Sequence, residues 1–215
     1  MTNAKTTYRG TVFDTGYSVI AIEREYASGG REISAKLAER LNLPLYGQEI
    51  LEQAADKMNL PVKYLGEIEE SIRGSLLFTL ATFANYTSGN ETDLLMLEQK
   101  LAFAEAEVIR NFALKPCVIL GRGAAALLKD KANTFRVFIH ADYASRKERA
   151  IGVYGVDPNS AEPALRRNDK RRANYFAATT EKEWKDADIY HLFINSGLLG
   201  VDRAVDLLYA AVTQG

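Results

Sequence analysis

The sequence predicts an α/β protein in which helices cover a parallel β-sheet. Several short, almost continuous apolar runs are rich in β-branched and aromatic residues, as strands buried on both faces are. These runs alternate with segments of helical periodicity, and such alternation is typical of a parallel sheet with right-handed crossovers. The expected strands are 17–22, 117–120, 135–139 and 190–194, with a weaker strand at 43–46.

The helices follow from apolar spacing between these strands. In 32–41, Ile33, Leu37 and Leu41 recur four residues apart and would form one buried stripe. The stretch from 48 to about 113 is longer than one crossover needs, which predicts an inserted helical subdomain. The expected helices are 32–41, 94–113, 144–151, 163–178 and 201–212.

Composition narrows the class of protein. The 215 residues suffice for one large domain or for a core with an inserted subdomain. A net charge of −1 gives no overall case for nucleic-acid binding, and no apolar run approaches the roughly 20 residues that cross a bilayer. Cys117 is the only cysteine, which excludes an intramolecular disulfide and a cysteine metal cluster. We expect residues 1–16 to be a short polar leader rather than a secretory signal, and the protein to be cytoplasmic.

A glycine-containing turn, residues 27–31, follows the first long strand and precedes a helix. N–H groups at a helix start are unsatisfied and carry partial positive charge, and Gly29 and Gly30 would let a phosphate approach the backbone. Arg31 is disfavoured in a first helical turn unless an anion lies beside it. The turn is therefore a candidate phosphate site, although a tight turn with Arg31 in solvent is the alternative. The standard pattern G-x-x-x-x-G-K-[ST] matches only at Gly30.

Arg122 is a second candidate for phosphate binding. The sequence Gly121-Arg122-Gly123 directly follows the apolar run 117–120. Arg122 would thus lie at the carboxyl end of a parallel strand, where open α/β sheets bind their ligands. Its planar guanidinium matches two phosphate oxygens. A glycine-flanked turn with a solvated arginine is the alternative.

The segment 166–176 is strongly basic, with five cations and one acid. On a helix, one face would carry Arg167, Lys170, Arg171 and Asn174. Like charges there repel unless an anion screens them. The segment could form a lid that closes on nucleotide phosphates, a solvated basic face or a nucleic-acid-binding patch. The sequence has no second basic stretch that would enlarge a nucleic-acid-binding patch.

Three separated stretches together resemble the cytidylate kinase-like family, relatives of bacterial cytidylate kinase among the nucleoside monophosphate kinases. They read REYASGGREI at 24–33, VILGR at 118–122 and DKRRANY at 169–175, and 193–196 (FINS) is similar to the family's last strand. The resemblance covers about 19–212. It implies a three-layer P-loop kinase fold with a five-stranded parallel sheet and helices on both faces, in a single domain over 17–215. It also implies a helical acceptor-binding insertion at about 48–113 and a basic lid at about 155–180.

The resemblance further implies ATP and Mg²⁺ as cofactors and assigns residues to them. The ATP-binding residues would be Ala27, Ser28, Gly29, Gly30, Arg31 and Glu32, with Arg31 on the β- and γ-phosphates. The residues acting on the transferred phosphoryl group would be Arg31, Arg167, Lys170 and Arg171. Arg122 and Arg172 would bind the acceptor. No side chain is assigned to Mg²⁺, because Glu32 or Ile33 occupies the usual Ser/Thr position.

The chain departs from the family at three positions. Ala27 replaces a usual glycine, Gly47 a usual aspartate, and His140 an aspartate that contributes to nucleotide recognition. We expect an ATP-dependent phosphotransferase whose acceptor is a nucleoside monophosphate such as CMP or dCMP, or another small phosphorylated or hydroxyl compound. The alternatives are a non-catalytic nucleotide-binding protein of kinase fold and a nucleic-acid-associated module, because fold alone does not define function.

Overall fold

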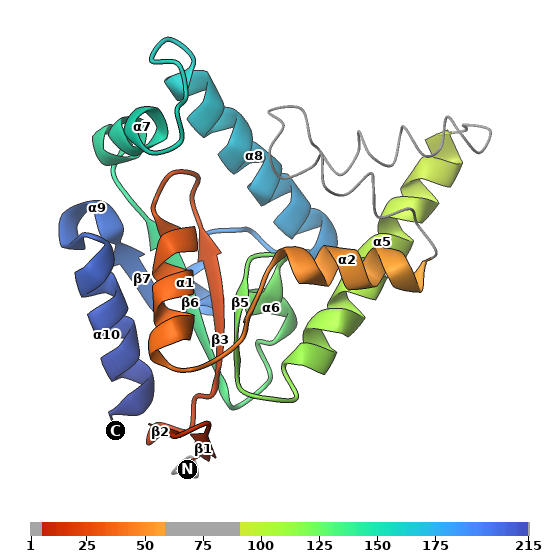
Figure 1. Ribbon diagram of the computed structural model, residues 1–215. Coiled ribbons are helices and arrows are strands. Elements are labelled where there is room, and N and C mark those ends of the chain that lie inside the picture. The colour runs from red at the N-terminus through yellow and green to blue at the C-terminus, as the bar shows by residue number, and fades with distance from the viewer. Residues whose placement is uncertain (1–5, 59–90, 215) are drawn as a thin grey trace. The chain divides into compact units, whose positions relative to one another are not determined.

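The computed structural model describes residues 6–58 and 91–214 (Figure 1). The chain forms two compact units, one made of Met1–Tyr46 with Phe112–Gly215 and the other of Gly47–Asn111. The first unit contains a five-stranded parallel sheet in the order β4-β5-β3-β6-β7. The strands are β3 (Val19–Arg24), β4 (Leu45–Tyr46), β5 (Cys117–Leu120), β6 (Thr134–His140) and β7 (Leu192–Asn195). The predicted α/β fold with five parallel strands is confirmed.

Four of the five strands differ from the predicted bounds by one or two residues. β4 begins at Leu45 rather than at 43, and β6 extends the predicted 135–139 by one residue at each end. β3 begins at Val19 rather than at 17 and continues to Arg24. It starts there because the N–H groups of Ser18 and Val19 both donate to the Asn133 carbonyl, at 3.0 and 3.1 Å. β7 begins at Leu192 rather than at 190, because Ala187–Ile189 form a 3-10 turn just before it.

Helices α1 (Gly30–Arg40) and α10 (Val201–Thr213) lie side by side over one face of the sheet (Figure 1). The predicted stripe of Ile33, Leu37 and Leu41 is fully buried. Each such aliphatic side chain contributes about 1.5–3 kcal/mol on burial. Leu208 and Val212 of α10 are equally buried against the same strands. This core fixes the start of α1 relative to the end of β3.

The opposite face of the sheet carries aromatic residues near β6. The Phe138 ring meets Trp184 and Tyr190 edge-on, with centroids 5.2 Å away in both cases. The remaining helices of this unit are α6 (Ala124–Leu127), α7 (Tyr143–Gly152), α8 (Ala161–Thr180) and α9 (Ser196–Leu199). α8 extends the predicted basic helix by two residues at each end.

The N-terminal segment is more structured than the expected leader. β1 (Thr6–Tyr8) and β2 (Thr11–Phe13) form an antiparallel hairpin. Phe13 is fully buried in the core beneath the sheet. The Thr11 hydroxyl donates to the Leu41 carbonyl at 2.7 Å, and the Thr15 hydroxyl donates to the Val212 carbonyl at 2.9 Å. Residues 6–15 therefore pack onto the first unit.

The second unit contains α2 (Gln48–Lys57) and most of α5 (Glu91–Phe112). Lys57 Nζ donates to Glu107 Oε1 at 2.6 Å and so connects the two helices. α5 begins three residues before the predicted start at 94. Residues 59–90 of the expected insertion lie outside the described residues. Among the helices that the structure describes, none is long and apolar enough to span a membrane.

Candidate functional site

The candidate site begins at the β3–α1 turn, residues 25–29. Ala27 and Gly29 have left-handed backbone angles, with φ of 59° and 74°. The Ser28 hydroxyl donates to the Glu25 carbonyl at 2.9 Å and closes the turn. A Cβ added to Gly30 would lie 2.6 Å from the Cβ of Arg24, so only glycine fits there. The chain therefore enters α1 through a tight, buried turn whose helical N–H groups are available to an anion.

Buried charges hold this turn. Glu25 is only 7% exposed, and its Oε2 lies 2.8 Å from Arg146 Nη1. Arg146 Nη2 lies 2.6 Å from Asp169 Oδ2, and Asp169 Oδ1 accepts from the Tyr26 N–H at 2.7 Å. Lys185 also pairs with Glu25. The turn is thus tied to α7, to α8 and to the loop 181–185.

The charge states in this network support each other. Burial raises the pKa of Glu25, but hydrogen bonds from Lys185 and Arg146 outweigh burial, so the pKa lies below its ordinary value. Burial lowers the pKa of Arg146, but the hydrogen bond to Glu25 and the charge of Asp169 reverse the direction and leave it raised. Both groups are therefore ionised at neutral pH.

Arg149 lies over the start of α1. A Cβ on Gly29 would come within 3.2 Å of the Arg149 Cζ. Arg149 also pairs with Glu32 in the first turn of α1, and Lys36 Nζ lies 3.4 Å from the other Glu32 oxygen. Arg31 is exposed in the same helical turn. Motif reasoning missed Arg149, because its partner Glu32 is 117 residues away in the chain.

The β5–α6 turn, Gly121-Arg122-Gly123, lies beside the first turn. All three residues have left-handed φ angles, 77°, 60° and 72° in chain order. For the non-glycine Arg122 this conformation costs about 1–2 kcal/mol. A Cβ on Gly121 would collide with the Arg24 guanidinium, which therefore lies against this turn. The Arg122 Cζ lies 5.8 Å from the centre of the Tyr175 ring.

A buried carboxylate completes the second turn. Glu23 Oε1 accepts from the Gly123 N–H at 3.0 Å, and Glu23 Oε2 accepts from Trp184 Nε1 at 3.4 Å. Burial raises the pKa of Glu23 above its ordinary value, although Arg24 and both hydrogen bonds act in the opposite direction.

Five arginines gather between the two turns and α8. We call them the arginine group: Arg24, Arg122, Arg167, Arg171 and Arg172. Arg172 Nη1 donates to the Arg24 carbonyl at 3.0 Å. Burial, followed by the charge of Arg24, lowers the pKa of Arg172 to about 9. Burial, followed by the charges of Arg122 and Arg167, lowers the pKa of Arg171. This repulsion would be relieved by a multiply charged anion such as a phosphate.

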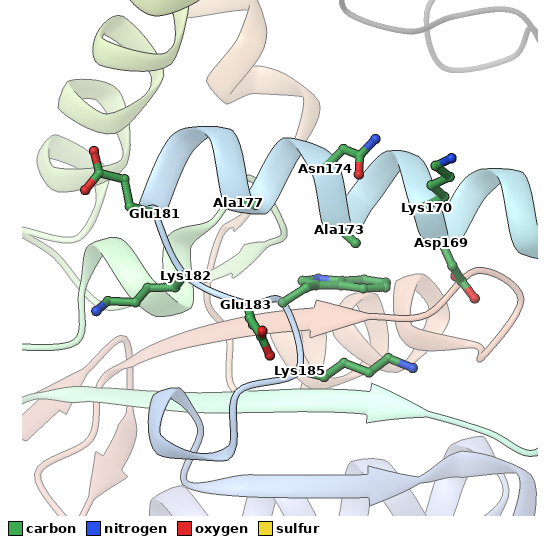
Figure 2. Close-up of a pocket in the computed structure, with 10 residues that line it drawn as sticks. Asp169, Lys170, Ala173, Asn174, Ala177, Glu181, Lys182, Glu183 and Lys185 are labelled. Carbon is green, nitrogen blue, oxygen red and sulfur yellow. The ribbon is translucent and has the colours of Figure 1, made fainter.

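The structure divides the predicted basic face of α8. Arg167 and Arg171 belong to the arginine group, whereas Lys170 and Asn174 line a hollow of about 740 Å³. Figure 2 shows this hollow between α8 and the loop 181–185, with Lys170 pointing away from the loop and Asp169 toward it. Of the cations predicted on this face, Arg171 lies near enough to Arg122 for their charges to repel, and Arg167 in turn acts on Arg171.

The residues at the β3–α1 turn fit the phosphates of ATP, because they combine a helix N-terminus, close backbone approach and nearby arginines. Within residues 6–58 and 91–214, no group of three potential ligands could hold a metal ion by itself. Nucleotide-bound Mg²⁺ needs only one or two protein ligands besides phosphates and waters. Glu32 is close in the chain, but it already pairs with Arg149 and Lys36.

The sheet order, the glycine turn before α1 and the cationic strand ends define a protein of the P-loop kinase fold. The chain belongs to the Cytidylate kinase-like family, which it matches over residues 19–198. The predicted resemblance is thereby confirmed.

Solved structures show the same fold. An uncharacterized protein from Eubacterium ventriosum is 26% identical, with 92% of this chain and 99% of that chain covered and a TM-score of 0.68. Shikimate kinase from Bacteroides thetaiotaomicron is 13% identical, with 90% and 97% covered and a TM-score of 0.50. No curated protein is matched.

Proposed function

We propose that the protein is an ATP-dependent phosphotransferase that phosphorylates a nucleoside monophosphate, with CMP or dCMP as the first candidates. One observation carries the proposal: two cationic turns follow the adjacent strands β3 and β5, and the arginine group lies beside both. Two phosphate-binding turns at neighbouring strand ends suit a reaction between two phosphorylated compounds. Family membership supports the kinase class.

In this proposal the two turns have different partners. The backbone of 27–32 and the Arg31 guanidinium bind the donor phosphates, and Arg149 adds positive charge over Gly29. Arg122 and Arg172 bind the phosphate of the acceptor. Phosphoryl transfer depends mainly on positioning and on neutralising charge, which are the properties that these groups supply. Mg²⁺, when bound with ATP, would neutralise the donor phosphates and be held mostly by them and by water.

The basic segment contributes the groups that close on the transferred phosphoryl group. Arg167, Lys170 and Arg171 would act there, and residues 48–113 would bind the rest of the acceptor. Asp169 and Arg172 connect α8 to the end of β3 and the following turn. If the segment acts as a lid, ATP plus acceptor should slow hydrogen exchange over 166–176, whereas RNA should have little effect.

A non-catalytic nucleotide-binding protein is the second candidate. The observation that favours it is the pairing of Glu32 with Arg149 at the start of α1, where a metal-binding hydroxyl would be expected. Such a protein would bind ATP and a monophosphate without turnover.

The deciding experiment is a coupled assay of ADP formation with ATP, Mg²⁺ and a panel of monophosphates and small hydroxyl compounds. Turnover with one acceptor supports the enzyme. Calorimetric binding of ATP and a monophosphate without turnover supports the second candidate instead. Arg122→Ala should raise the KM for the acceptor while leaving ATP affinity nearly unchanged, and the exposed Arg203→Ala on α10 is the matched control. The opposite pattern in Arg122→Ala would reverse the assignment of the two turns.

A further inference from the structure

Glu23 is a buried carboxylate to which the proposed reaction assigns no role. It lies near the end of the central strand β3 and pairs in register with Phe138 of β6. Only 3% of the residue is exposed. An acidic residue so placed must have hydrogen-bond partners, because a buried charge without them is strongly unfavourable.

Its two partners come from different parts of the fold. Oε1 accepts from the Gly123 N–H at 3.0 Å, and Oε2 accepts from the indole N–H of Trp184 at 3.4 Å. One carboxylate thereby joins the β5–α6 turn to the loop 181–185. Trp184 is itself held in place, because its carbonyl accepts from the Tyr190 hydroxyl at 2.7 Å and its ring meets Phe138 edge-on.

The β5–α6 turn needs such an external hold. Three consecutive left-handed residues are unusual, and Arg122 in the middle lacks the freedom of glycine. The turn also approaches the end of α8 closely, since a Cβ on Gly123 would lie 2.8 Å from Thr180 Cγ2. The hydrogen bond from Gly123 to Glu23 offsets part of the cost of this conformation.

We propose that Glu23 is a positioning residue that fixes the β5–α6 turn through Gly123, thereby directs Arg122, and couples this turn to Trp184. The hydrogen bonds of Glu23 with Gly123 and Trp184 do not depend on the reaction that the protein catalyses. Their expected effect on acceptor binding rests on the proposed function. Trp184 is the only tryptophan in the chain, so its fluorescence reports this coupling alone. A phosphate that binds Arg122 should therefore change the emission of Trp184.

The test compares Glu23→Gln with wild type and with Glu183→Gln, an exposed neighbour of Trp184. The glutamine keeps one oxygen for Gly123 but presents an N–H₂ group that cannot accept from the indole. Exchange of the Trp184 indole N–H should accelerate about tenfold, the loss of roughly one hydrogen bond, and the KM for the acceptor should rise by a smaller factor, because the amide oxygen still accepts from Gly123. The KM for ATP should not change in Glu23→Gln, and the Trp184 emission spectrum should not change in Glu183→Gln.

Trp184→Phe is the second variant, because it keeps an aromatic ring but removes the donor. It should accelerate exchange of the Gly123 N–H and raise the KM for the acceptor less than Glu23→Gln does. Titration of wild type with CMP or inorganic phosphate should change Trp184 emission, and Arg122→Ala should abolish the change.

Unchanged indole and Gly123 exchange in both variants would overturn the proposal, as would an equal rise of both KM values. Failure of the proposed function has a different signature. Wild type would then neither bind nor turn over any monophosphate, while the exchange rates and the response to inorganic phosphate would still decide the role of Glu23.

Discussion

The two cationic turns are held in opposite ways. The β3–α1 turn is fixed by ionised side chains, in which Glu25 meets Arg146 and Lys185 while Asp169 meets Arg146 and a backbone N–H of the turn. The β5–α6 turn is held by a backbone hydrogen bond from Gly121 to the Ile22 carbonyl, at 2.8 Å, and by the carboxylate of Glu23, whose burial raises its pKa.

This difference matches the different demands on the two turns. In the proposed function the β3–α1 turn binds the phosphates of ATP, which every substrate pair shares, and the β5–α6 turn binds an acceptor, which must suit one compound. The first turn is held by a shared ion network, whereas the second combines a strained backbone with hydrogen bonds from Gly121 to the Ile22 carbonyl and from Gly123 to Glu23.

The largest expected effect is at the centre of the network of the β3–α1 turn. Arg146→Ala leaves the partly buried Asp169 without its cation and the buried Glu25 with Lys185 alone, and should lower the free energy of unfolding by about 3 kcal/mol. Urea unfolding measures this loss as a lower midpoint concentration of urea, at an unchanged slope of the free energy of unfolding against urea concentration. The control is Arg166→Ala, whose pair with Glu162 is exposed and contributes less than about 1 kcal/mol. A loss in Arg146→Ala as small as the control would show that the network does not hold the turn.

The next effect concerns ATP. Arg31→Ala removes a cation from the first turn of α1 and should weaken ATP binding by at least about 1.5 kcal/mol, more than tenfold in Kd. Calorimetry on the folded variant measures it, with Arg203→Ala as the control. Unchanged affinity would mean that the β3–α1 turn does not bind ATP through Arg31.

A smaller effect, with opposite signs in two measurements, is expected at Arg122. Arg122→Gly should relieve about 1 kcal/mol of backbone strain, partly offset by the greater freedom of glycine in the unfolded chain. The same variant should raise the KM for the acceptor. Thermal unfolding together with steady-state kinetics checks both. Reduced stability with an unchanged KM would contradict the view that Arg122 is strained for a function.

The smallest effect is on pH dependence, because the two carboxylates oppose each other. The lowered pKa of Glu25 adds stability above its ordinary value near 4.5, and this stability is lost as pH falls through the lower folded pKa. The raised pKa of Glu23 acts in reverse, so its contribution is lost as pH rises through the higher folded pKa. Glu25→Gln should therefore remove a rise of stability with pH below about pH 4.5, whereas Glu23→Gln should remove a fall of stability with pH above about pH 4.5. Urea midpoints measured on both sides of pH 4.5 would show these changes, and slopes equal to those of wild type would contradict the assignment.

The fold was predictable because its main signals are local. Continuous apolar runs marked the parallel strands, and the spacing of Ile33, Leu37 and Leu41 marked the buried side of α1. The last strand starts later than predicted because the Tyr190 N–H donates to the Ala187 carbonyl at 3.3 Å, as part of the 3-10 turn, instead of joining the sheet. The burial of Phe13 was equally invisible, because the apolar pair Val12-Phe13 is too short to show a periodic pattern.

The candidate site was predictable only in part. Arg31 and Arg122 follow glycines at strand ends, and this position is readable from sequence. The roles of Arg149 and Glu23 cannot be read from the sequence in this way. The partner of Arg149 lies 117 residues away in the chain, and the partners of Glu23 lie at least 100 residues away. The division of the predicted basic face also required coordinates, since helical spacing cannot show which neighbours flank α8.

The pairing of β3 also has a consequence during synthesis. Val19 meets Cys117 and Thr134, so the central strand waits about 100 residues for its first neighbour on β5 and longer for the second on β6. At about 5–20 residues per second, the ribosome needs roughly 5–20 s to deliver β5. Throughout that interval the apolar strand has two unpaired edges in the nascent chain. The earliest-made part of the candidate site is therefore the part that waits longest for its partners in the sheet.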